Sequence, residues 1–306
     1  MRVVVIGCGA VGAALSVEAA RGGADVHVIT RSAAGCARRL VEVRGLGSAP
    51  VNVCGWADAP READVLVFAT KAYDVSAAVS QSLSAGLRPR LAVSVQNGLG
   101  PLEVVEEAFQ SSAGALVYLG LTRLDACRAL YTGGRRVVLG CRGYCDEGAL
   151  RGLADALASA GLEAEVVGAR DFEGERWVKV AVNTAINPLT LVTWSRNGRI
   201  ATDQLLREAA AAVASETGRV GAALGVELPE DPAEATIRTA RETSENCSST
   251  VQDVANGRRT ELDYLNRAVW ERSLGLSFRA ALNLLAYESA EAAAVWLRGK
   301  RSPCEG

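Results

Sequence analysis

Three polar side chains recur at four-residue intervals in a stretch that otherwise reads as an apolar helix. Lys179, Asn183 and Asn187 lie between Glu175 and Thr190. In a helix each four-residue step advances about 40° around the axis, so the three side chains share one narrow face. A lysine beside two neutral amides could donate a proton and hydrogen-bond a small polar ligand. A solvated polar stripe is the structural alternative, although asparagine is a poor helix former.

Lysine is rare in this chain. Of the 33 basic residues only Lys71, Lys179 and Lys300 are lysines, and Lys300 lies in the C-terminal tail. Arginine cannot release its proton at physiological pH, whereas a partly desolvated lysine can have its pKa lowered. Lys179 is therefore the candidate proton donor.

A proline limits the same helix. Pro188 cannot donate to the carbonyl four residues back, at Thr184, and it disfavours helical geometry at Asn187. We therefore expect the helix to bend or end near Asn187. The shared face is then safest for Lys179 and Asn183.

A strand, a glycine-rich turn, a helix and a second strand open the chain. The strands are expected at residues 2–6 and 25–29, with the helix between them. In this context Gly-x-Gly-x-x-Gly is the dinucleotide-binding fingerprint, in which the glycines allow a tight turn, close approach of the pyrophosphate and helix packing. A plain glycine turn is the disfavoured alternative. The predicted cofactor loop consists of Gly7, Cys8, Gly9, Ala10, Val11 and Gly12.

The end of the second strand indicates the cofactor. Enzymes that prefer the unphosphorylated dinucleotide usually carry an acidic residue there. This chain has no Asp or Glu between residues 26 and 40 and continues with Arg31 instead. Arg31 can stack on adenine and pair with a 2′-phosphate, with Arg38 or Arg39 as a second cation. We therefore expect NADPH, with a solvated Arg31 as the alternative.

Strands and helices alternate up to about residue 168. Further strands are expected at 41–44, 51–54, 64–69, 91–95, 114–119, 135–140 and 163–167, with helices near 73–84, 101–109 and 146–159. This pattern predicts a mostly parallel, doubly wound Rossmann domain over residues 1–168. The remainder, residues 169–306, is predicted to be an α-helical domain, with further helices near 202–225, 232–244 and 278–298.

Two loops lie where open α/β sheets bind ligands, at the carboxyl ends of strands. The first carries Lys71 and the second contains Asn97 within a polar, glycine-rich turn at residues 96–100. Both are candidate cofactor contacts, although either could be a routine loop.

Composition excludes several classes of protein. Hydrophobic residues make up 49% of the chain and charged residues 22%, with a net charge of −2. This is a globular composition, and the charge gives no case for binding nucleic acid or an acidic membrane. Since no apolar run is long enough to span a bilayer and no signal-peptide pattern precedes the first strand, we expect a cytoplasmic protein.

Metal sites are not expected. The single histidine, His27, lies in a strand pattern, and the eight cysteines include no Cys-x-x-Cys pair. Cys141 and Cys145 are four residues apart, but no second ligand pair accompanies them. Intracellular disulfides are expected only if the source is a hyperthermophile. The sequence does not determine the oligomeric state and leaves a homodimer open.

Six blocks follow one another along the chain: residues 7–12, Lys71, 96–100, 177–190, 248–253 and 257–263. Together they resemble the ketopantoate reductase (2-dehydropantoate 2-reductase) family. The resemblance covers nearly the whole chain. It implies NADPH-dependent reduction of the 2-oxo acid 2-dehydropantoate to (R)-pantoate, on the route to pantothenate and coenzyme A. It also implies a Rossmann domain followed by a helical domain of the 6-phosphogluconate-dehydrogenase type.

The resemblance also implies roles for single residues. Lys179 becomes the general acid, because hydride attack on a ketone develops alkoxide charge that an ammonium can stabilise and protonate. Glu261 would lie beside both substrate and nicotinamide, a surface salt bridge being its alternative, and Gly120 would lie near the cofactor. Asn97 would touch substrate and cofactor. The implied substrate contacts are Asn97, Asn183, Asn187, Asn197 and Ser249.

Two departures from the family pattern leave the substrate open. The chain has Asn266-Arg267 where the family usually has Asn-Gly, and Ser277-Phe278 where it tends to have Thr-Pro. A reductase of another branched 2-oxo acid is therefore an alternative. A non-catalytic dinucleotide-sensing regulator is a third reading, disfavoured because a sensor has no use for a proton donor.

Overall fold

The computed structural model describes residues 1–304, which divide into two compact units. The first unit comprises Met1–Gln96 and Pro101–Phe172. The second comprises Asn97–Gly100 and the chain from Glu173 onwards. The short segment Asn97–Gly100 thus belongs to the second unit although its sequence neighbours belong to the first.

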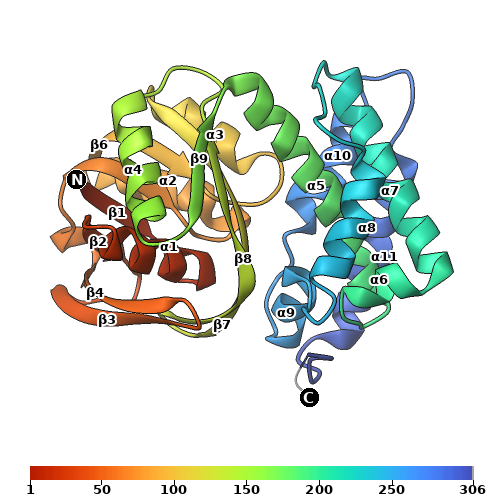
Figure 1. Ribbon diagram of the computed structural model, residues 1–306, viewed down its shortest axis with the longest axis horizontal. Helices are drawn as coiled ribbons and strands as arrows, with labels where there is room; N and C mark the ends of the chain where they lie inside the picture. Colours follow the sequence, from red (N-terminus) through yellow and green to blue (C-terminus); the bar gives the residue numbers. More distant parts are fainter. Residues whose placement is uncertain (305–306) are drawn as a thin grey trace. The chain divides into compact units, whose positions relative to one another are not determined.

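A nine-stranded sheet forms the centre of the first unit (Figure 1). The strand order is β3-β4-β2-β1-β5-β6-β7-β8-β9. Neighbours from β4 to β7 pair in parallel, whereas β3 with β4 and β7 with β8 are antiparallel. The predicted doubly wound, mostly parallel sheet is confirmed. The strands are β1 (Arg2–Ile6), β2 (Asp25–Ile29), β3 (Cys36–Arg44), β4 (Gly47–Cys54), β5 (Glu62–Phe68), β6 (Arg88–Ser94), β7 (Ser112–Asp125), β8 (Arg128–Gly140) and β9 (Glu163–Val167).

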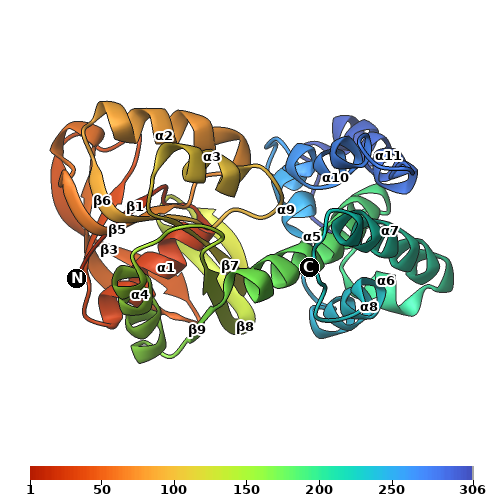
Figure 2. The ribbon, with the colours of Figure 1, turned by 90° about the horizontal axis from the view of Figure 1, so that it is seen from above.

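Helices cover both faces of this sheet, which explains why its central strands are runs of buried valine and leucine rather than alternating patterns. Helices α1 (Ala10–Arg21) and α4 (Glu147–Ser159) pack on one face. Helices α2 (Val75–Ser84) and α3 (Pro101–Ala108) pack on the other, as Figure 2 shows. The strand order reverses between β1 and β5, so the loops after these strands lie at the ligand-binding edge of such a sheet.

The hairpins extend beyond the predicted strands. β3 begins at Cys36 rather than at residue 41, and its first five residues are exposed. They are held by pairing with β4, from Cys36 opposite Cys54 to Val43 opposite Gly47. Since these side chains face solvent, no hydrophobic alternation marks them in the sequence.

The second unit is helical and is built around α5 (Ala169–Val192) (Figure 1). Within this unit, residues of α5 enter three apolar clusters: Val182 packs in one, Leu191 in another and Trp177 in a third. The predicted long helices are found, whereas the shortest helices of this unit are too short to show a clear period in the sequence. The other helices are α6 (Gly198–Thr202), α7 (Gln204–Ala223), α8 (Pro232–Glu242), α9 (Ser249–Ala255), α10 (Asn266–Ser273) and α11 (Ala281–Leu297).

Helix α5 does not end at Asn187. It continues through Pro188 to Val192, so an end of the helix at this point is wrong, whereas a bend there stays a prediction. Proline removes the donor for the carbonyl of Thr184, but Asn266 Nδ2 donates to that carbonyl at 2.8 Å. A side chain from a neighbouring element thus replaces the hydrogen bond that the sequence had removed.

All eight cysteines are paired in disulfides, which are Cys8–Cys127, Cys36–Cys54, Cys141–Cys145 and Cys247–Cys304.

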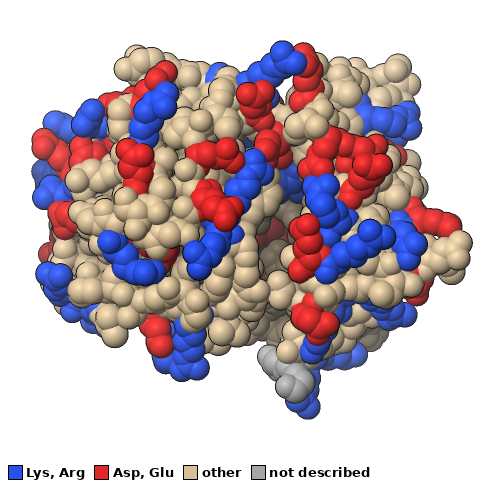
Figure 3. Space-filling model, viewed as in Figure 1, with Lys and Arg blue, Asp and Glu red and all other residues tan. Residues whose placement is uncertain are grey.

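The described chain contains no helix long and apolar enough to cross a membrane. Acidic and basic side chains are interspersed on the face shown in Figure 3.

Candidate functional site

The glycine-rich turn after β1 has the geometry that its spacing predicts. Gly7 has a φ of 101° and its N–H donates to the carbonyl of Ile29 at 3.0 Å. A Cβ on Gly12 would lie 2.1 Å from the carbonyl oxygen of Gly7, so only glycine fits there. A Cβ on Gly9 would meet no described atom within 4 Å. The space above Gly9 is therefore open to a ligand.

The start of α1 is suited to an anion. Ala10 and Val11 form its first turn, and within the described chain this end has neither a capping side chain nor an acidic residue. Unsatisfied N–H groups and the helix dipole at such an end bind phosphate. The loop is also anchored, because Cys8 is disulfide-bonded to Cys127 and its carbonyl accepts from the Cys127 N–H at 3.0 Å. These features fit a dinucleotide pyrophosphate.

Arg31 lies two residues after the end of β2 and is exposed. No acidic side chain of the described residues pairs with it, so its guanidinium is available to a ligand. Arg38 and Arg39 are consecutive residues of β3 and therefore point to opposite faces of the strand. At most one of them can lie on the same side as Arg31.

The loops after β5 and β6 are joined by Gln96, which the sequence reading did not single out. Gln96 Nε2 donates to the carbonyls of Phe68 at 2.7 Å and Thr70 at 3.0 Å. Ser94 Oγ in turn donates to Gln96 Oε1 at 2.7 Å. This side chain fixes the backbone immediately before Lys71. The signal in the sequence was its position, a polar residue directly after a buried strand.

Gly120 lies in β7, where the pairing with β8 is irregular. It stands opposite Gly133, and the register shifts on both sides of it. Such bulges re-aim the backbone of a strand. The structure therefore places Gly120 at a local break of the ladder.

The segment Asn97–Gly100 is tied to the region of Glu261. The Leu99 N–H donates to the carbonyl of Tyr264 at 2.8 Å, and a Cβ on Gly98 would lie 2.2 Å from that same oxygen. Glu261 directly precedes the short 3₁₀ helix Leu262–Tyr264. The fold thus brings the segment carrying Asn97 to the segment carrying Glu261, which are more than 160 residues apart in sequence.

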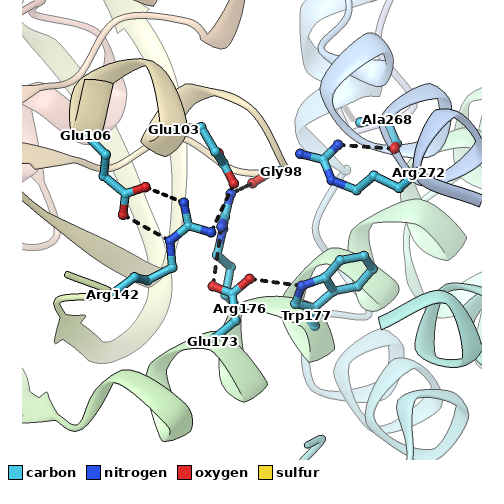
Figure 4. A network of polar contacts seen from close by, with 9 residues as sticks. All are labelled: Gly98, Glu103, Glu106, Arg142, Glu173, Arg176, Trp177, Ala268 and Arg272. Carbon is cyan, nitrogen blue, oxygen red and sulfur yellow. Dashed lines mark hydrogen bonds and ion pairs between the residues drawn. The ribbon is translucent and has the colours of Figure 1, made fainter. Parts of the chain in front are cut away.

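The first turns of α5 also hold this segment (Figure 4). Arg176, which is buried, donates to the carbonyl of Gly98 at 3.3 Å and pairs with Glu173 at 3.3 Å. Trp177 Nε1 donates to the other oxygen of Glu173 at 3.0 Å. Sequence reasoning missed both Glu173 and Arg176, because a charged residue near a helix start ordinarily indicates a solvated face.

Lys179 lies on the one face of α5 that is partly exposed between residues 175 and 188. Within residues 175–188, all of them described, only Glu175, Lys179 and Asn183 keep appreciable exposure. They follow at four-residue spacing, so solvent reaches α5 along one face. Burial of its ammonium lowers the pKa of Lys179 to about 7, against the opposing effect of the Glu175 carboxylate. Lys179 can therefore exchange a proton near neutral pH.

Asn187 follows Asn183 at the same four-residue spacing but is buried in the helical unit. Its side chain is 5% exposed, and Nδ2 donates to Ser249 Oγ at 3.5 Å. Thr190 Oγ1, one turn onwards, lies 2.8 Å from Ser248 Oγ, and Ser248 in turn caps α9. Ser249 itself is exposed. The fold therefore brings Asn187 and Ser249 together, as two hydrogen-bonding groups from segments 62 residues apart.

Asn197 is more constrained than a free ligand contact would be. Its Nδ2 donates to Thr243 Oγ1 at 3.0 Å, and that hydroxyl donates onwards to the carbonyl of Thr239 at 2.7 Å. The Asn197 side chain is buried, and Oδ1 has no hydrogen-bond partner among the described residues. Asn197 Oδ1 is therefore a buried acceptor without a partner among the described residues, whereas its amide nitrogen already holds the turn.

One cluster of potential metal ligands was not predicted. His27, Cys36 and Cys54 place their ligand atoms within 4.8 Å of one another, through strand pairing that the sequence spacing does not show. The two sulfurs are joined to each other as a disulfide, and His27 Nε2 lies 3.2 Å from Asp25 Oδ2. In this state the cysteines have no thiolate to offer a metal.

The Asn266 bridge to α5 yields a test by mutation. We expect Asn266→Leu to lower the free energy of unfolding by about 1–3 kcal/mol, because the buried carbonyl of Thr184 loses its replacement donor. Pro188→Ala restores the backbone N–H that donates to the Thr184 carbonyl in an uninterrupted helix. Chemical denaturation of both single variants and the double variant should show that Asn266→Leu costs less when it is combined with Pro188→Ala. Strictly additive effects would contradict this pairing.

Comparison with known proteins agrees with this arrangement. The model of the family "Ketopantoate reductase PanE/ApbA" matches residues 3–143, and its C-terminal model matches residues 171–293. A 2-dehydropantoate 2-reductase from Pyrobaculum aerophilum is 35% identical over 280 residues, which cover 91% of this chain and 93% of the relative.

Solved structures show the same fold. A PanE/ApbA family ketopantoate reductase from Ralstonia eutropha JMP134 is 27% identical with a TM-score of 0.81, covering 97% of this chain and 99% of that one. D-mandelate dehydrogenase with NADH and anilino(oxo)acetate has a TM-score of 0.83 over 97% of this chain and 99% of its own. At 18% identity the second likeness shows the fold alone.

Proposed function

Because this chain belongs to the ketopantoate reductase PanE/ApbA family, we propose that it reduces 2-dehydropantoate to (R)-pantoate with NADPH, in the biosynthesis of pantothenate and coenzyme A. The observation that carries the proposal is Lys179. Its pKa is lowered to about 7, and it shares the partly exposed face of α5 with Asn183. This is the requirement for an acid that protonates a developing alkoxide at neutral pH.

In this proposal the glycine loop and the start of α1 hold the cofactor pyrophosphate, with Lys71, Asn97 and Gly120 as further contacts. The bound nicotinamide supplies the hydride. The open space above Gly9 and the uncapped helix end support the assignment. The cofactor is thus assigned mainly to residues 1–168 and the substrate mainly to residues 169–306.

The substrate is proposed to lie along α5. Asn183 and the Asn187–Ser249 pair would hydrogen-bond the 2-oxo carboxylate without adding charge that opposes the Lys179 ammonium. Asn197 Oδ1 would accept from the substrate hydroxyl, since its amide nitrogen is engaged by Thr243. Glu261 would orient Lys179 or accept from that hydroxyl. Lys179 then gives its proton to the substrate oxygen as hydride reaches the carbonyl carbon.

A steady-state assay of the purified protein tests the function. We expect NADPH oxidation with 2-dehydropantoate at a higher kcat/KM than with other branched 2-oxo acids. Turnover of other 2-oxo acids alone would instead support a related reductase, which the departures at Arg267 and Phe278 motivate. Cofactor binding without oxidation of NADPH or NADH would identify a dinucleotide sensor and reject the proposal.

The preference for NADPH rests on Arg31. We expect Arg31→Ala to raise the Kd of NADPH about 10-fold or more while changing the Kd of NADH little, because only NADPH carries the 2′-phosphate. Titration of protein fluorescence with each cofactor measures both constants. Arg61→Ala is the matched control, because Arg61 is exposed but precedes β5, at the opposite end of a strand from the ligand edge. An equal loss for both cofactors would contradict the assignment.

A further inference from the structure

Three neighbouring strands of the sheet bring a histidine and two cysteines together. Strands β2, β4 and β3 pair so that Ile29 stands beside Cys54, and Cys54 stands opposite Cys36. His27 is two residues before Ile29, and side chains two apart along a strand point to the same face. His27, Cys36 and Cys54 therefore share one face of the sheet, and their donor atoms lie within 4.8 Å of one another.

The imidazole of His27 is already oriented as a metal ligand. Its Nε2 lies 3.2 Å from Asp25 Oδ2, and its Nδ1 lies 4.0 Å from Cys54 Sγ. An ionised carboxylate only accepts, so in the neutral ring Nε2 carries the proton and the lone pair of Nδ1 is left on the side of the sulfur. Asn52 Nδ2 is 3.5 Å from Nε2, too far to compete with Asp25. A carboxylate behind the ring is a common support of a histidine that binds metal.

We propose that reduction of the Cys36–Cys54 disulfide creates a zinc site, in which the two thiolates and His27 Nδ1 bind the ion. A dithiol reduces the disulfide: its two S–H groups give up two electrons and two protons and close to a disulfide, and each cysteine becomes a thiol. Zn²⁺ then displaces the two thiol protons, so the ion and its three protein ligands are neutral overall. Thiolate and imidazole are the usual ligands of Zn²⁺ in proteins.

The cluster is close to the size of a zinc site. Zn–S bonds of about 2.3 Å and Zn–N bonds of about 2.1 Å place the donor atoms of a tetrahedral site roughly 3.5–3.8 Å apart. The distance of 4.0 Å between His27 Nδ1 and Cys54 Sγ is near this value, and the two sulfurs separate once their bond is broken. Cys54 is buried and Cys36 is exposed, so a reductant reaches the disulfide from the Cys36 side. Water completes the four ligands on that side.

The site lies at the base of the loop that follows β2. The Thr30 N–H donates to the carbonyl of Cys54 at 3.1 Å, and the Gly55 N–H donates to the carbonyl of Gly35 at 2.9 Å. The disulfide joins Cys36 to Cys54 beside these two hydrogen bonds. A zinc ion in its place keeps β3 joined to β4 next to this loop under reducing conditions. The site contains neither cofactor nor substrate, so it can be tested independently of the reductase activity.

NMR of the histidine ring tests the site. His27 is the only histidine of the chain, so in the untagged, ¹⁵N-labelled full chain the two ring nitrogens give unambiguous signals. The protein is reduced with a phosphine, because a dithiol would itself bind zinc. We expect a titration with Zn²⁺ to shift Nδ1 and to leave Nε2 protonated in the reduced protein, and to change neither nitrogen in the oxidised protein.

Two double variants assign the thiolates. In Cys36→Ser/Cys54→Ser, half-saturation of the His27 signal should need at least about 100-fold more Zn²⁺, because loss of even a supporting group of a metal ligand costs about 10- to 100-fold in affinity. Cys141→Ser/Cys145→Ser is the matched control, since it also removes one disulfide and should leave the Nδ1 shift unchanged.

Several outcomes would overturn the site. One is a His27 signal that Zn²⁺ does not change in the reduced protein, whatever metal the other cysteines bind. Coordination through Nε2 would reject the support by Asp25 and with it the arrangement of ligands. Equal zinc affinity at His27 in the two double variants would show that Cys36 and Cys54 are not ligands. Loss of the folded state on reduction that zinc does not reverse would also count against the site.

Discussion

Replacing Lys179 with alanine is expected to lower kcat for reduction of 2-dehydropantoate at least about 1,000-fold. The substitution removes both the proton donor and the positive charge beside the alkoxide, and each effect alone contributes on the order of 100-fold or more. The Kd of NADPH should change only a few-fold, because the glycine loop and α1 belong to the other structural unit. Stopped-flow measurement of hydride transfer, together with a cofactor titration, checks both.

One substitution separates the roles of Lys179, and a second serves as the control. Lys179→Arg keeps the positive charge but cannot release a proton, so it should remain strongly impaired. Lys300→Ala removes an exposed lysine of the tail and should have no effect. Near-normal turnover of Lys179→Arg would reject the proton-donor role and leave only an electrostatic one.

The pH dependence has a defined sign. The ammonium form of Lys179 donates the proton, and its pKa is lowered to about 7 by burial. Reduction should therefore be fastest below this pH and fall about tenfold per unit as the pH rises well above it. The profile of kcat/KM reports this group in the free enzyme. A rate that is flat between about pH 6 and 9 in wild type would contradict the assignment.

Replacing Gly9 with alanine is expected to weaken NADPH binding by about 5- to 150-fold, the range that roughly 1–3 kcal/mol of overpacking implies. The added methyl group meets no described protein atom within 4 Å. It would instead enter the space assigned to the pyrophosphate. The melting temperature without cofactor should therefore stay within about 2 °C of wild type, while the stabilisation by added NADPH shrinks.

Gly12→Ala provides the contrasting case. Its Cβ would collide with the carbonyl of Gly7, so the substitution should lower both stability and cofactor affinity. Gly143→Ala is the neutral control, because that Cβ also meets no described atom and the residue is remote in sequence from the loop. If Gly9→Ala lowered stability as much as Gly12→Ala, the open space would not be a ligand site.

Local sequence patterns predicted the elements that position the candidate site. The valine-rich β1, the turn at Gly7 and the periodic apolar face of α5 each depend on residues close together in the chain. Burial on both sides of a strand or on one side of a helix leaves a composition that can be read directly. The exposed half of β3 gives no such signal, because pairing alone holds it.

The continuation of α5 past Asn187 shows what local rules cannot include. Pro188 leaves the Thr184 carbonyl without a donor from its own helix. On that basis the sequence predicted that the helix bends or ends near Asn187. The replacement donor, Asn266, is 82 residues away, and no local rule could identify it. The same holds for the bond from Leu99 to Tyr264, which links the segments of Asn97 and Glu261.

The sequence by itself determined that Lys179 and Asn183 share a helical face, because four-residue spacing fixes direction within a helix. Tertiary structure alone decided the chemical state of that lysine. Its pKa depends on how far packing removes water from around the ammonium, and this burial lowers it to about 7. Residue type thus determines which group can donate a proton, and packing determines the pH at which that group does so.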